Sequence, residues 1–224
     1  MKIGIIGAME SEIELLLSKM TNKKSQIHAT RTFYEGELLG KEIVLVQSGI
    51  GKVNAGIVTQ MMITRYGVSY IINTGIAGSL DAGLDIGDIV VSTDAVYHDV
   101  EATEFGYQRG QVPGLDVQKF VASSKLLSLI PEKNHIKKGT VTTGDQFINN
   151  HSIKKDIKTT FGGMCVEMEG AAIGQTCYLN GVEFLIIRSI SDNADEEAVE
   201  DYPMNEALAV ERATEITEAI IKQL

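Results

Sequence analysis

The amino-acid sequence predicts an α/β fold in which helices cover both faces of one central β-sheet. Short β-rich runs alternate with helical segments along the 224 residues, as expected of a sheet built from strand–helix units. Several strand candidates are apolar throughout, which is typical of strands covered on both faces. The length suits one domain with a sizeable core, and no segment resembles an interdomain linker. We therefore expect residues 1–224 to form a single domain.

The strands are predicted from β-rich apolar runs. The first, "KIGIIG" at 2–7, is apolar apart from its lysine and ends at a glycine. The others are "FYEGEL", "EIVLVQSG", "SYIINTG", "DIVVST", "KKGTVTTG", "GMCVEME" and "EFLIIRSIS", at 33–38, 42–49, 69–75, 88–93, 137–144, 163–169 and 183–191.

The helices are predicted from apolar residues at helical spacing. Ile13, Leu16 and Leu17 define the inward face of the first helix, and Leu208 to Ile220 show the same spacing in the last. The least regular stretch is 94–118, and long loops in compact domains are often functional. The predicted helices are 10–20, 53–66, 117–130, 152–160, 169–180 and 204–222.

The net charge disfavours polyanionic partners. Thirty acidic residues against 20 Lys and Arg give a formal charge of −10, which would repel nucleic acid and anionic lipid. Aromatic residues make up 6% of the chain and Trp is absent, so an aromatic platform for stacking nucleic-acid bases is also disfavoured. A small neutral or cationic ligand fits better, although solubility alone would explain the charge equally well.

Cysteine and histidine patterns predict neither disulfides nor a metal site. Cys165 and Cys177 stand alone, and the four His residues lack HxxxH or HExxH spacing. The N-terminal apolar run is interrupted by Glu10 and does not resemble a signal peptide. No stretch approaches the roughly 20 apolar residues that a membrane span requires. We therefore expect a cytoplasmic protein without a metal ion.

The ligand site is expected beyond the strand ends, where open α/β sheets bind ligands. Nucleotide-phosphate motifs are absent there. Gly4 and Gly7 do not complete G-x-G-x-x-G, and "SGIGKVNAG" lacks the pattern of a P-loop. Instead, Glu10, Glu12 and Glu14 lie at the start of the first helix, where carboxylates would compete with phosphate for the backbone amides.

Other acidic residues also follow strands, each with two possible roles. The acids of the first helix could simply complement the helix dipole. In a strand, Glu167 and Glu169 would face the same side, as a solvated edge or as part of a ligand site. A buried Arg188 would need a carboxylate partner. Asp192 could cap a following helix or reach into the crevice as an acid.

Eight segments, in order, carry a resemblance to a known family. They are "MKIGIIGAMESE", "SGIGKVNAG", "IINTGIAGSL", "GDIVVST", "YHDVEATEFGYQRGQVPG", "TTGDQFI", "VEMEGAAIGQ" and "IRSISDNAD". Together they resemble the purine nucleoside phosphorylase/hydrolase superfamily, and within it the bacterial 5'-methylthioadenosine/S-adenosylhomocysteine nucleosidases. The resemblance implies a three-layer α/β/α domain with a twisted mixed sheet, assembled as a homodimer. It also implies hydrolysis of an N-glycosidic bond that releases adenine from an adenosine thioether, without a cofactor.

The resemblance further implies roles for individual residues. Glu12 matches the base that activates water, Asp192 the acid that protonates adenine N7, and Glu169 the carboxylate that binds the ribose hydroxyls. The matching substrate-binding residues are Met9, Ile50 and Tyr202 around the 5' group, Met168 along the sugar, Phe147 and Ile148 at the purine, and Gly78, Glu167, Arg188 and Ser191. Phe105 and Pro113 lie in a segment that resembles the part crossing the dimer interface.

The physical chemistry of the reaction agrees with these roles. Positive charge develops on the ribose in the transition state, and a negatively charged pocket stabilises it. Adenine leaves readily only after N7 is protonated, so an acid is needed. One residue departs from the family: Ile76 occupies the position of a serine that orients water, and a backbone amide could replace that hydroxyl. A phosphate-dependent phosphorylase and a non-catalytic adenosine-derivative binding protein are the alternatives.

Overall fold

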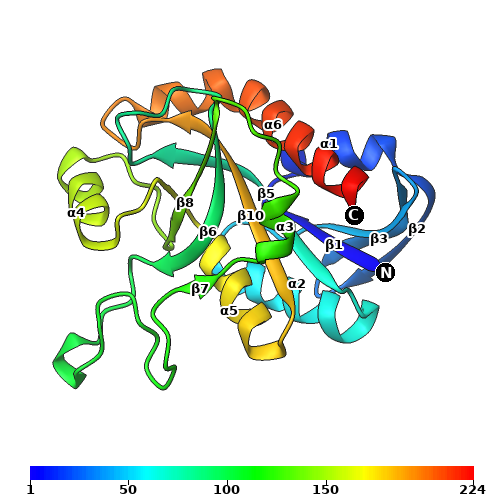
Figure 1. Cartoon of the computed structure of the whole chain (residues 1–224), viewed down its shortest axis with the longest axis horizontal. Coiled ribbons are helices and arrows are strands. Elements are labelled where there is room, and N and C mark those ends of the chain that lie inside the picture. Colours follow the sequence, from blue (N-terminus) through cyan, green and yellow to red (C-terminus); the bar gives the residue numbers. More distant parts are fainter.

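The computed structural model describes residues 1–224 and contains one mixed ten-stranded sheet between helices (Figure 1). The strand order is β10-β6-β8-β9-β5-β1-β4-β3-β2, with β7 paired to β6. Because β10 pairs with both β6 and β5, five strands close into a ring and the remaining strands extend from it. The strands are β1 Lys2–Gly7, β2 Thr21–His28, β3 Arg31–Leu38, β4 Lys41–Gln47, β5 Tyr70–Ser79, β6 Ile89–Tyr97, β7 Phe120–Val121, β8 Ile136–Thr143, β9 Cys165–Glu167 and β10 Glu183–Asp192.

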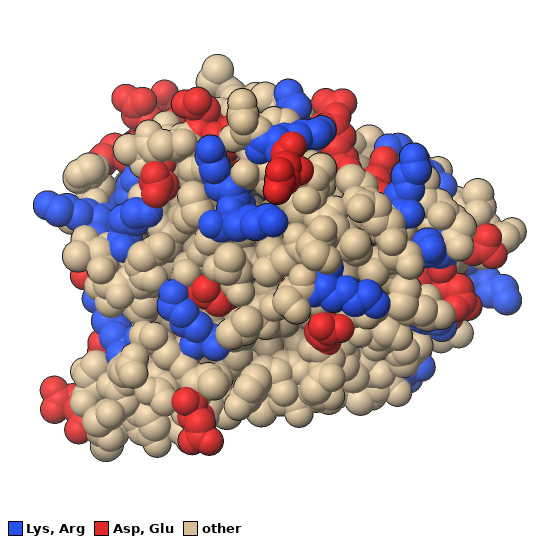
Figure 2. Space-filling view, in the orientation of Figure 1, with Lys and Arg blue, Asp and Glu red and all other residues tan.

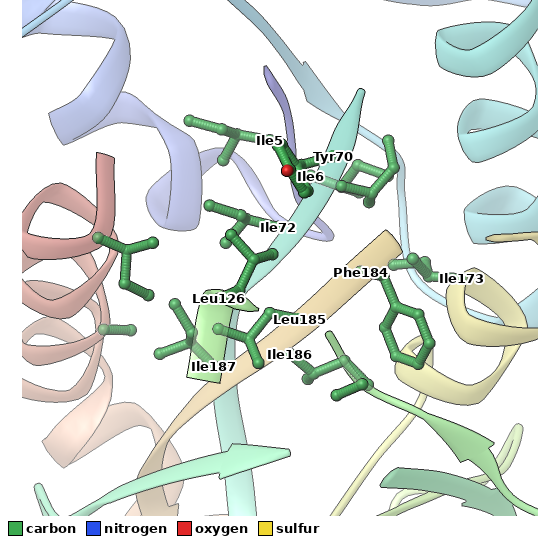
Figure 3. Close-up of a cluster of buried hydrophobic side chains, with 14 of the residues drawn as sticks. Ile5, Ile6, Tyr70, Ile72, Leu126, Ile173, Phe184, Leu185, Ile186 and Ile187 are labelled. Carbon is green, nitrogen blue, oxygen red and sulfur yellow. The ribbon is translucent and has the colours of Figure 1, made fainter. Parts of the chain in front are cut away.

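The centre of the sheet is buried on both faces. Strands β1, β5 and β10 run parallel to one another, and all ten residues of β5 are buried. Figure 3 shows side chains from these strands packed among the surrounding elements. Continuous burial explains why the strands read as apolar runs rather than as alternating patterns.

Helices form a layer on each face of the sheet. Helices α1 and α6 pack together on one face, and α2 and α5 pack together on the other (Figure 1). None of the helices combines the length and the apolar composition that spanning a membrane requires. The helices are α1 Glu10–Lys19, α2 Lys52–Tyr66, α3 Ser124–Ser128, α4 His151–Phe161, α5 Gly170–Asn180 and α6 Ala198–Gln223, with a 3-10 turn, η1, at Thr103–Phe105.

The predicted α/β fold is confirmed, and so is the mixed sheet that the resemblance implied. One predicted helix is wrong. Only Ser124–Ser128 is helical within 117–130, because Phe120 and Val121 instead pair with β6. Strand β2 was not predicted, and β6 continues to Tyr97 inside the segment expected to be irregular. Helix α6 begins at Ala198 rather than 204 and contains Pro203.

Candidate active site

A cavity of about 390 Å³ lies where the segments after β1, β4, β8 and β9 meet the last residues of β5 and β10. Its volume is in the range of small-molecule sites. Eleven residues that the sequence predicted line it: Met9, Glu12, Ile50, Gly78, Phe147, Glu167, Met168, Glu169, Ser191, Asp192 and Tyr202. The other four lining residues are Ala8, Ile76, Ala77 and Val166.

Glu12 is buried at the start of α1, whereas its neighbours Glu10 and Glu14 are exposed. One carboxylate oxygen, Oε2, accepts hydrogen bonds from the N–H groups of Ala8 at 2.6 Å and Met9 at 3.0 Å. The other, Oε1, accepts the Ile76 N–H at 3.0 Å. A backbone amide of Ile76 therefore contacts Glu12 at the position where the family has a serine.

The pKa of Glu12 is raised above its usual value by burial. The positive charge of Arg188 and the three backbone N–H groups act in the opposite direction, because they favour the ionised form. The result is a buried carboxylate that holds protons more tightly than an exposed Glu, as a proton acceptor requires.

Asp192 lies at the end of β10 and is 3% exposed. Its Oδ1 accepts the Ala194 N–H at 2.9 Å, and its Oδ2 accepts the Ser191 hydroxyl at 2.8 Å. It does not cap α6, whose N-cap residue is Glu197. Burial raises the pKa of Asp192, and the nearby charges of Asp201 and Asp195 add to this effect. A raised pKa favours the protonated form that a general acid needs.

The two carboxyl groups lie against different residues of strand β5. A Cβ placed on Gly75 would overlap Glu12 Oε1, and one on Gly78 would lie 2.8 Å from Asp192 Oδ1. Three residues of extended strand span about 10 Å. Glu12 and Asp192 therefore lie against positions of β5 that are three residues apart, and both line the same cavity.

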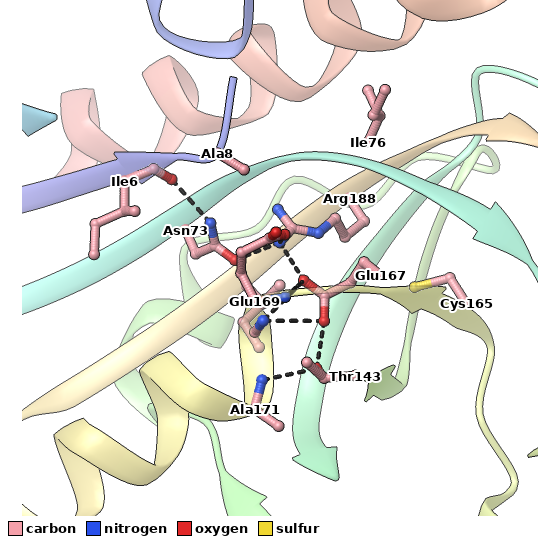
Figure 4. A network of polar contacts seen from close by, with 12 residues as sticks. Ile6, Ala8, Asn73, Ile76, Thr143, Cys165, Glu167, Glu169, Ala171 and Arg188 are labelled. Atoms are coloured by element: carbon pink, nitrogen blue, oxygen red, sulfur yellow. Dashed lines mark hydrogen bonds and ion pairs between the residues drawn. The ribbon is translucent and has the colours of Figure 1, made fainter. Parts of the chain in front are cut away.

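Behind the cavity, Arg188 is buried in a polar network (Figure 4). Its guanidinium forms an ion pair with Glu167, lies 3.7 Å from Glu169 Oε2, and donates to Asn73 Oδ1 at 2.6 Å. The carboxylate of Glu167 also accepts the N–H groups of Glu169 at 3.1 Å and Gly170 at 2.8 Å. This confirms that buried Arg188 has carboxylate partners, which compensate its desolvation.

The network limits which of its members can reach a ligand. Arg188 does not line the cavity. Glu167 lines it, but both of its oxygens are already hydrogen-bonded, one of them to the Thr143 hydroxyl. Both residues thus support the site from behind, whereas Glu169 borders the open space. The sequence missed Asn73 and Thr143, because no pattern reveals that their strands converge on Arg188 and Glu167.

Glu169 is the N-cap residue of α5 and is 5% exposed. Its Oε1 accepts the Gly51 N–H at 2.8 Å. Burial and the neighbouring charge of Glu167 raise its pKa to about 8, against the lowering effects of Arg188 and the Gly51 N–H. Its Oε2 makes no hydrogen bond within the protein, so this oxygen is available to a hydroxyl group in the cavity.

Carboxylates occupy the N-termini of the helices that face the cavity. Backbone N–H groups at the start of α1 donate to Glu12, and those at the start of α5 donate to Glu167. Those at the start of α2 donate to Glu169 and Asp145. Free helix N-termini are typical phosphate-binding sites. No Lys or Arg lines the cavity either. The site therefore lacks the donors that would bind a phosphate ion.

The opposite wall of the cavity is apolar and aromatic. The rings of Phe147 and Tyr202 meet edge to face with centroids 6.2 Å apart, and the Tyr202 hydroxyl lies 3.2 Å from Met9 Sδ. Ile50 and Phe147 are each about half-exposed at the mouth. Ile148 lines an adjoining cavity of about 40 Å³. This wall suits a flat heterocycle and an apolar substituent.

Four predicted residues do not line this cavity: Arg188 and Ile148, described above, and Phe105 and Pro113. Phe105 belongs to η1, where its side chain is 84% exposed, and Pro113 follows in the same loop. The missed lining residues Ala8, Ala77 and Val166 are small apolar neighbours of predicted ones. Their place beside strand ends was the only signal that could have identified them. The chain contains no group of three or more His, Cys, Asp or Glu residues arranged to hold a metal ion.

The sequence and structure are similar to those of known proteins. The model of the phosphorylase superfamily matches residues 2–222. A 5'-methylthioadenosine/S-adenosylhomocysteine nucleosidase of Exiguobacterium sp. is 47% identical over 206 residues, which cover 88% of each chain. The corresponding protein of Staphylococcus saprophyticus is 44% identical over 228 residues, which cover 99% of this chain and 100% of the relative.

Among solved structures, the nucleosidase of the same name from Neisseria meningitidis, in complex with methylthio-immucillin-A, superposes with a TM-score of 0.97. It is 39% identical, and the match covers 100% of this chain and 99% of that one. The chain therefore belongs to the phosphorylase superfamily and, within it, to the 5'-methylthioadenosine/S-adenosylhomocysteine nucleosidases, which hydrolyse an N-glycosidic bond.

Proposed function

We propose that this nucleosidase uses Glu12 as general base and Asp192 as general acid to release adenine from 5'-methylthioadenosine, S-adenosylhomocysteine and 5'-deoxyadenosine. The observation that carries the proposal is the pair of buried carboxyl groups that line one cavity and lie against positions of β5 three residues apart. Inverting glycosidases use such a pair, with room for water between the base and the scissile bond.

Glu12 accepts a proton from the attacking water, and Asp192 donates one to adenine N7. Hydrogen bonds from Ala8, Met9 and Ile76 hold the carboxylate of Glu12 in a fixed orientation, so little reorganisation is needed as water attacks. The Ser191 hydroxyl and the Ala194 N–H fix Asp192 in the same way. The raised pKa of each group suits its role.

Glu169 binds the ribose hydroxyls through its free carboxylate oxygen. The ionised form of Glu169, together with that of Glu12, stabilises the positive charge that develops on the sugar as the N-glycosidic bond breaks. Arg188 and Glu167 act from behind the cavity and keep this carboxylate in place. Met168 follows Glu167 along the sugar side of the cavity.

The remaining cavity residues bind the two ends of the substrate. Phe147 stacks on the purine, with Gly78 and the backbone of Ile148 beside its edge. Met9, Ile50 and Tyr202 form an apolar wall around the 5' substituent. An apolar wall favours a thioether over a hydroxyl group, but only modestly, since a hydrophobic pocket discriminates against an added hydroxyl by about 10².

The chain also forms a homodimer in this proposal, with the loop that carries Phe105 and Pro113 reaching the partner. Exposed apolar side chains on α2, α5 and this loop support it: Val53 is 72% exposed and Leu179 is 61% exposed. The loop around η1 projects from the body in Figure 1. Figure 2 shows that the lower edge of this face, near α5, carries few charged residues. Monomers rarely expose extended apolar patches.

An adenine-release assay in phosphate-free buffer tests the proposed substrates. We expect adenine from all three, and incorporation of one solvent oxygen at the sugar C1' when the reaction runs in H₂¹⁸O. A phosphate requirement with formation of a sugar 1-phosphate would indicate a phosphorylase instead. Tight binding of 5'-methylthioadenosine without adenine release would indicate a binding protein.

A further inference from the structure

A cluster of three charged residues, Lys52, Asp99 and Asp145, joins three chain segments beside the cavity. The ammonium group of Lys52 contacts Asp99 Oδ2 at 2.6 Å and Asp145 Oδ2 at 3.7 Å. Asp99 Oδ2 also accepts the Asp145 N–H at 2.9 Å, and Asp145 Oδ1 accepts the Lys52 N–H at 2.9 Å. One carboxylate oxygen of Asp99 thus binds the segments that follow both β4 and β8.

The Lys52–Asp99 pair is shielded from solvent. The side chains are 23% and 17% exposed, respectively, and Asp99 Oδ1 is buried without a hydrogen-bond partner. Exposed ion pairs contribute little to the stability of a fold, because solvent screens the charges and the side chains remain mobile. A partly desolvated pair that also accepts a backbone N–H fixes the geometry of its surroundings more firmly.

The two segments that Asp99 joins carry residues at the mouth of the cavity. Ile50 precedes Lys52 by two residues, and Phe147 follows Asp145 by two residues. Between Ile50 and Lys52, the Gly51 N–H donates to Glu169 Oε1 at 2.8 Å. The position of Asp99 therefore affects the positions of Ile50 and Phe147 and, through the Gly51 N–H, that of the Glu169 carboxylate.

We propose that Asp99 is a positioning residue for substrate binding, which sets the separation between Ile50 and Phe147 by holding the loops 48–52 and 144–147 together. It lines no part of the cavity and so touches neither the substrate nor the reacting atoms. The inference rests on the proposed function, because Ile50 and Phe147 bind the 5' group and the purine there.

The variant Asp99→Ala tests the proposal, with Asp94→Ala as a matched control. Asp94 has an 18% exposed side chain, lies 3.2 Å from Lys119 Nζ and accepts the Thr140 hydroxyl at 2.8 Å. The Asp94→Ala variant therefore loses a lysine pair in which the aspartate is about equally shielded, although the Lys119 side chain is 35% exposed, and the pair lies outside the cavity lining. We expect Asp99→Ala to raise KM for 5'-methylthioadenosine by about tenfold or more, with kcat changed by less than about threefold.

The control separates positioning from general destabilisation. We expect both variants to lower Tm, but Asp94→Ala to keep KM within about twofold of the wild type. The double variant Lys52→Met/Asp99→Ala should raise KM by less than the product of the two single effects, because the two changes share the loss of the Lys52–Asp99 ion pair. Should Asp99→Ala fail to fold, Asp99→Asn serves instead, with a smaller rise in KM because the bond to the Asp145 N–H is retained.

Three results would overturn the inference: an unchanged KM in the Asp99 variants, an equal rise in Asp94→Ala, or a rise that disappears at higher protein concentration. The last would mean that dimer dissociation, not loop position, weakens binding. In each case the wild type still releases adenine, so the proposed function stands. If the wild type releases no adenine, the proposed function fails and this inference fails with it.

Discussion

At the residue scale, side chains of the same type differ in burial and in hydrogen bonding because their partners are distant in sequence. Glu10, Glu12 and Glu14 all begin the same helix, yet only Glu12 is buried. Its partners Ile76 and Arg188 come from β5 and β10. Local pattern alone made all three plausible dipole partners. The resemblance to a family singled out Glu12, and the fold shows how it differs from its neighbours.

Glu169 gives a prediction about stability and pH. A carboxyl group with a higher pKa in the folded chain binds its proton more tightly there, so it stabilises the fold below its unfolded pKa, near 4.5. That contribution is lost as the pH rises towards about 8. We expect Glu169→Gln to raise Tm relative to the wild type, and the difference to grow between pH 4.5 and 8.

Thermal unfolding over this pH range, with the exposed Glu211→Gln as control, measures the difference. The control should track the wild type at every pH, since Glu211 is exposed on α6, away from the loop proposed to reach the partner. A Tm difference for Glu169→Gln that does not vary with pH would show that the folded-state pKa of Glu169 is not raised.

At the element scale, strands and helices whose buried residues are apolar could be predicted from the sequence. Strands that form only by pairing with a distant segment could not. Strand β2 is exposed and polar, and only its pairing with β3 makes it a strand. Residues 117–130 had helical spacing, but β6 draws Phe120 and Val121 into the sheet. Helix α6 was expected over 204–222, yet it begins at Ala198 and includes Pro203, although proline disrupts helix interiors.

Strand β5 shows how one element serves two purposes. Successive strand residues face opposite sides, so Asn73 and Gly75 border the Arg188 network, whereas Thr74 and Ile76 face α6. Figure 4 shows the Ile76 side chain pointing away from the polar network. It packs with Met9 and Tyr202, while its N–H holds Glu12. Its side chain and its backbone therefore act on different parts of the site.

Ile76→Ser should consequently alter selectivity rather than proton transfer. We expect the ratio of kcat/KM for 5'-methylthioadenosine to that for adenosine to fall by about tenfold, because an apolar wall around the 5' group becomes polar. The pH profile should keep its shape, since the N–H to Glu12 is retained. Ile76→Val, which keeps the wall apolar, is the control. A preserved ratio in Ile76→Ser would exclude Ile76 from this wall.

At the scale of the whole molecule, the location of the site could be predicted from the sequence more readily than the arrangement of its side chains. The rule that ligands bind beyond strand ends gave the place, and the resemblance to the family identified 11 of the 15 residues around the cavity. The supporting residues Asn73, Thr143 and Asp99 were not found, because each acts through contacts across different strands and loops. Such convergence is a property of the closed ring of strands.

The proposed dimer makes a prediction at this scale. Phe105→Ser removes an 84% exposed ring from the projecting loop, so we expect the chain to shift from dimer towards monomer in light scattering, with lower activity at low protein concentration. Ile27→Ser changes a 73% exposed residue on β2, away from that loop, and should leave both properties unchanged. An unaltered dimer in Phe105→Ser would exclude this ring from the interface.

The central claim is that Glu12 and Asp192 perform the hydrolysis together. The most direct test measures single-turnover adenine release from 5'-methylthioadenosine by the wild type, Glu12→Gln and Asp192→Asn in phosphate-free buffer. Both substitutions preserve side-chain shape, and loss of a general base or acid costs about 10²–10⁴ in rate. We predict a loss of at least this size in each variant, with the Tm retained. Release at the wild-type rate by either variant would contradict the account.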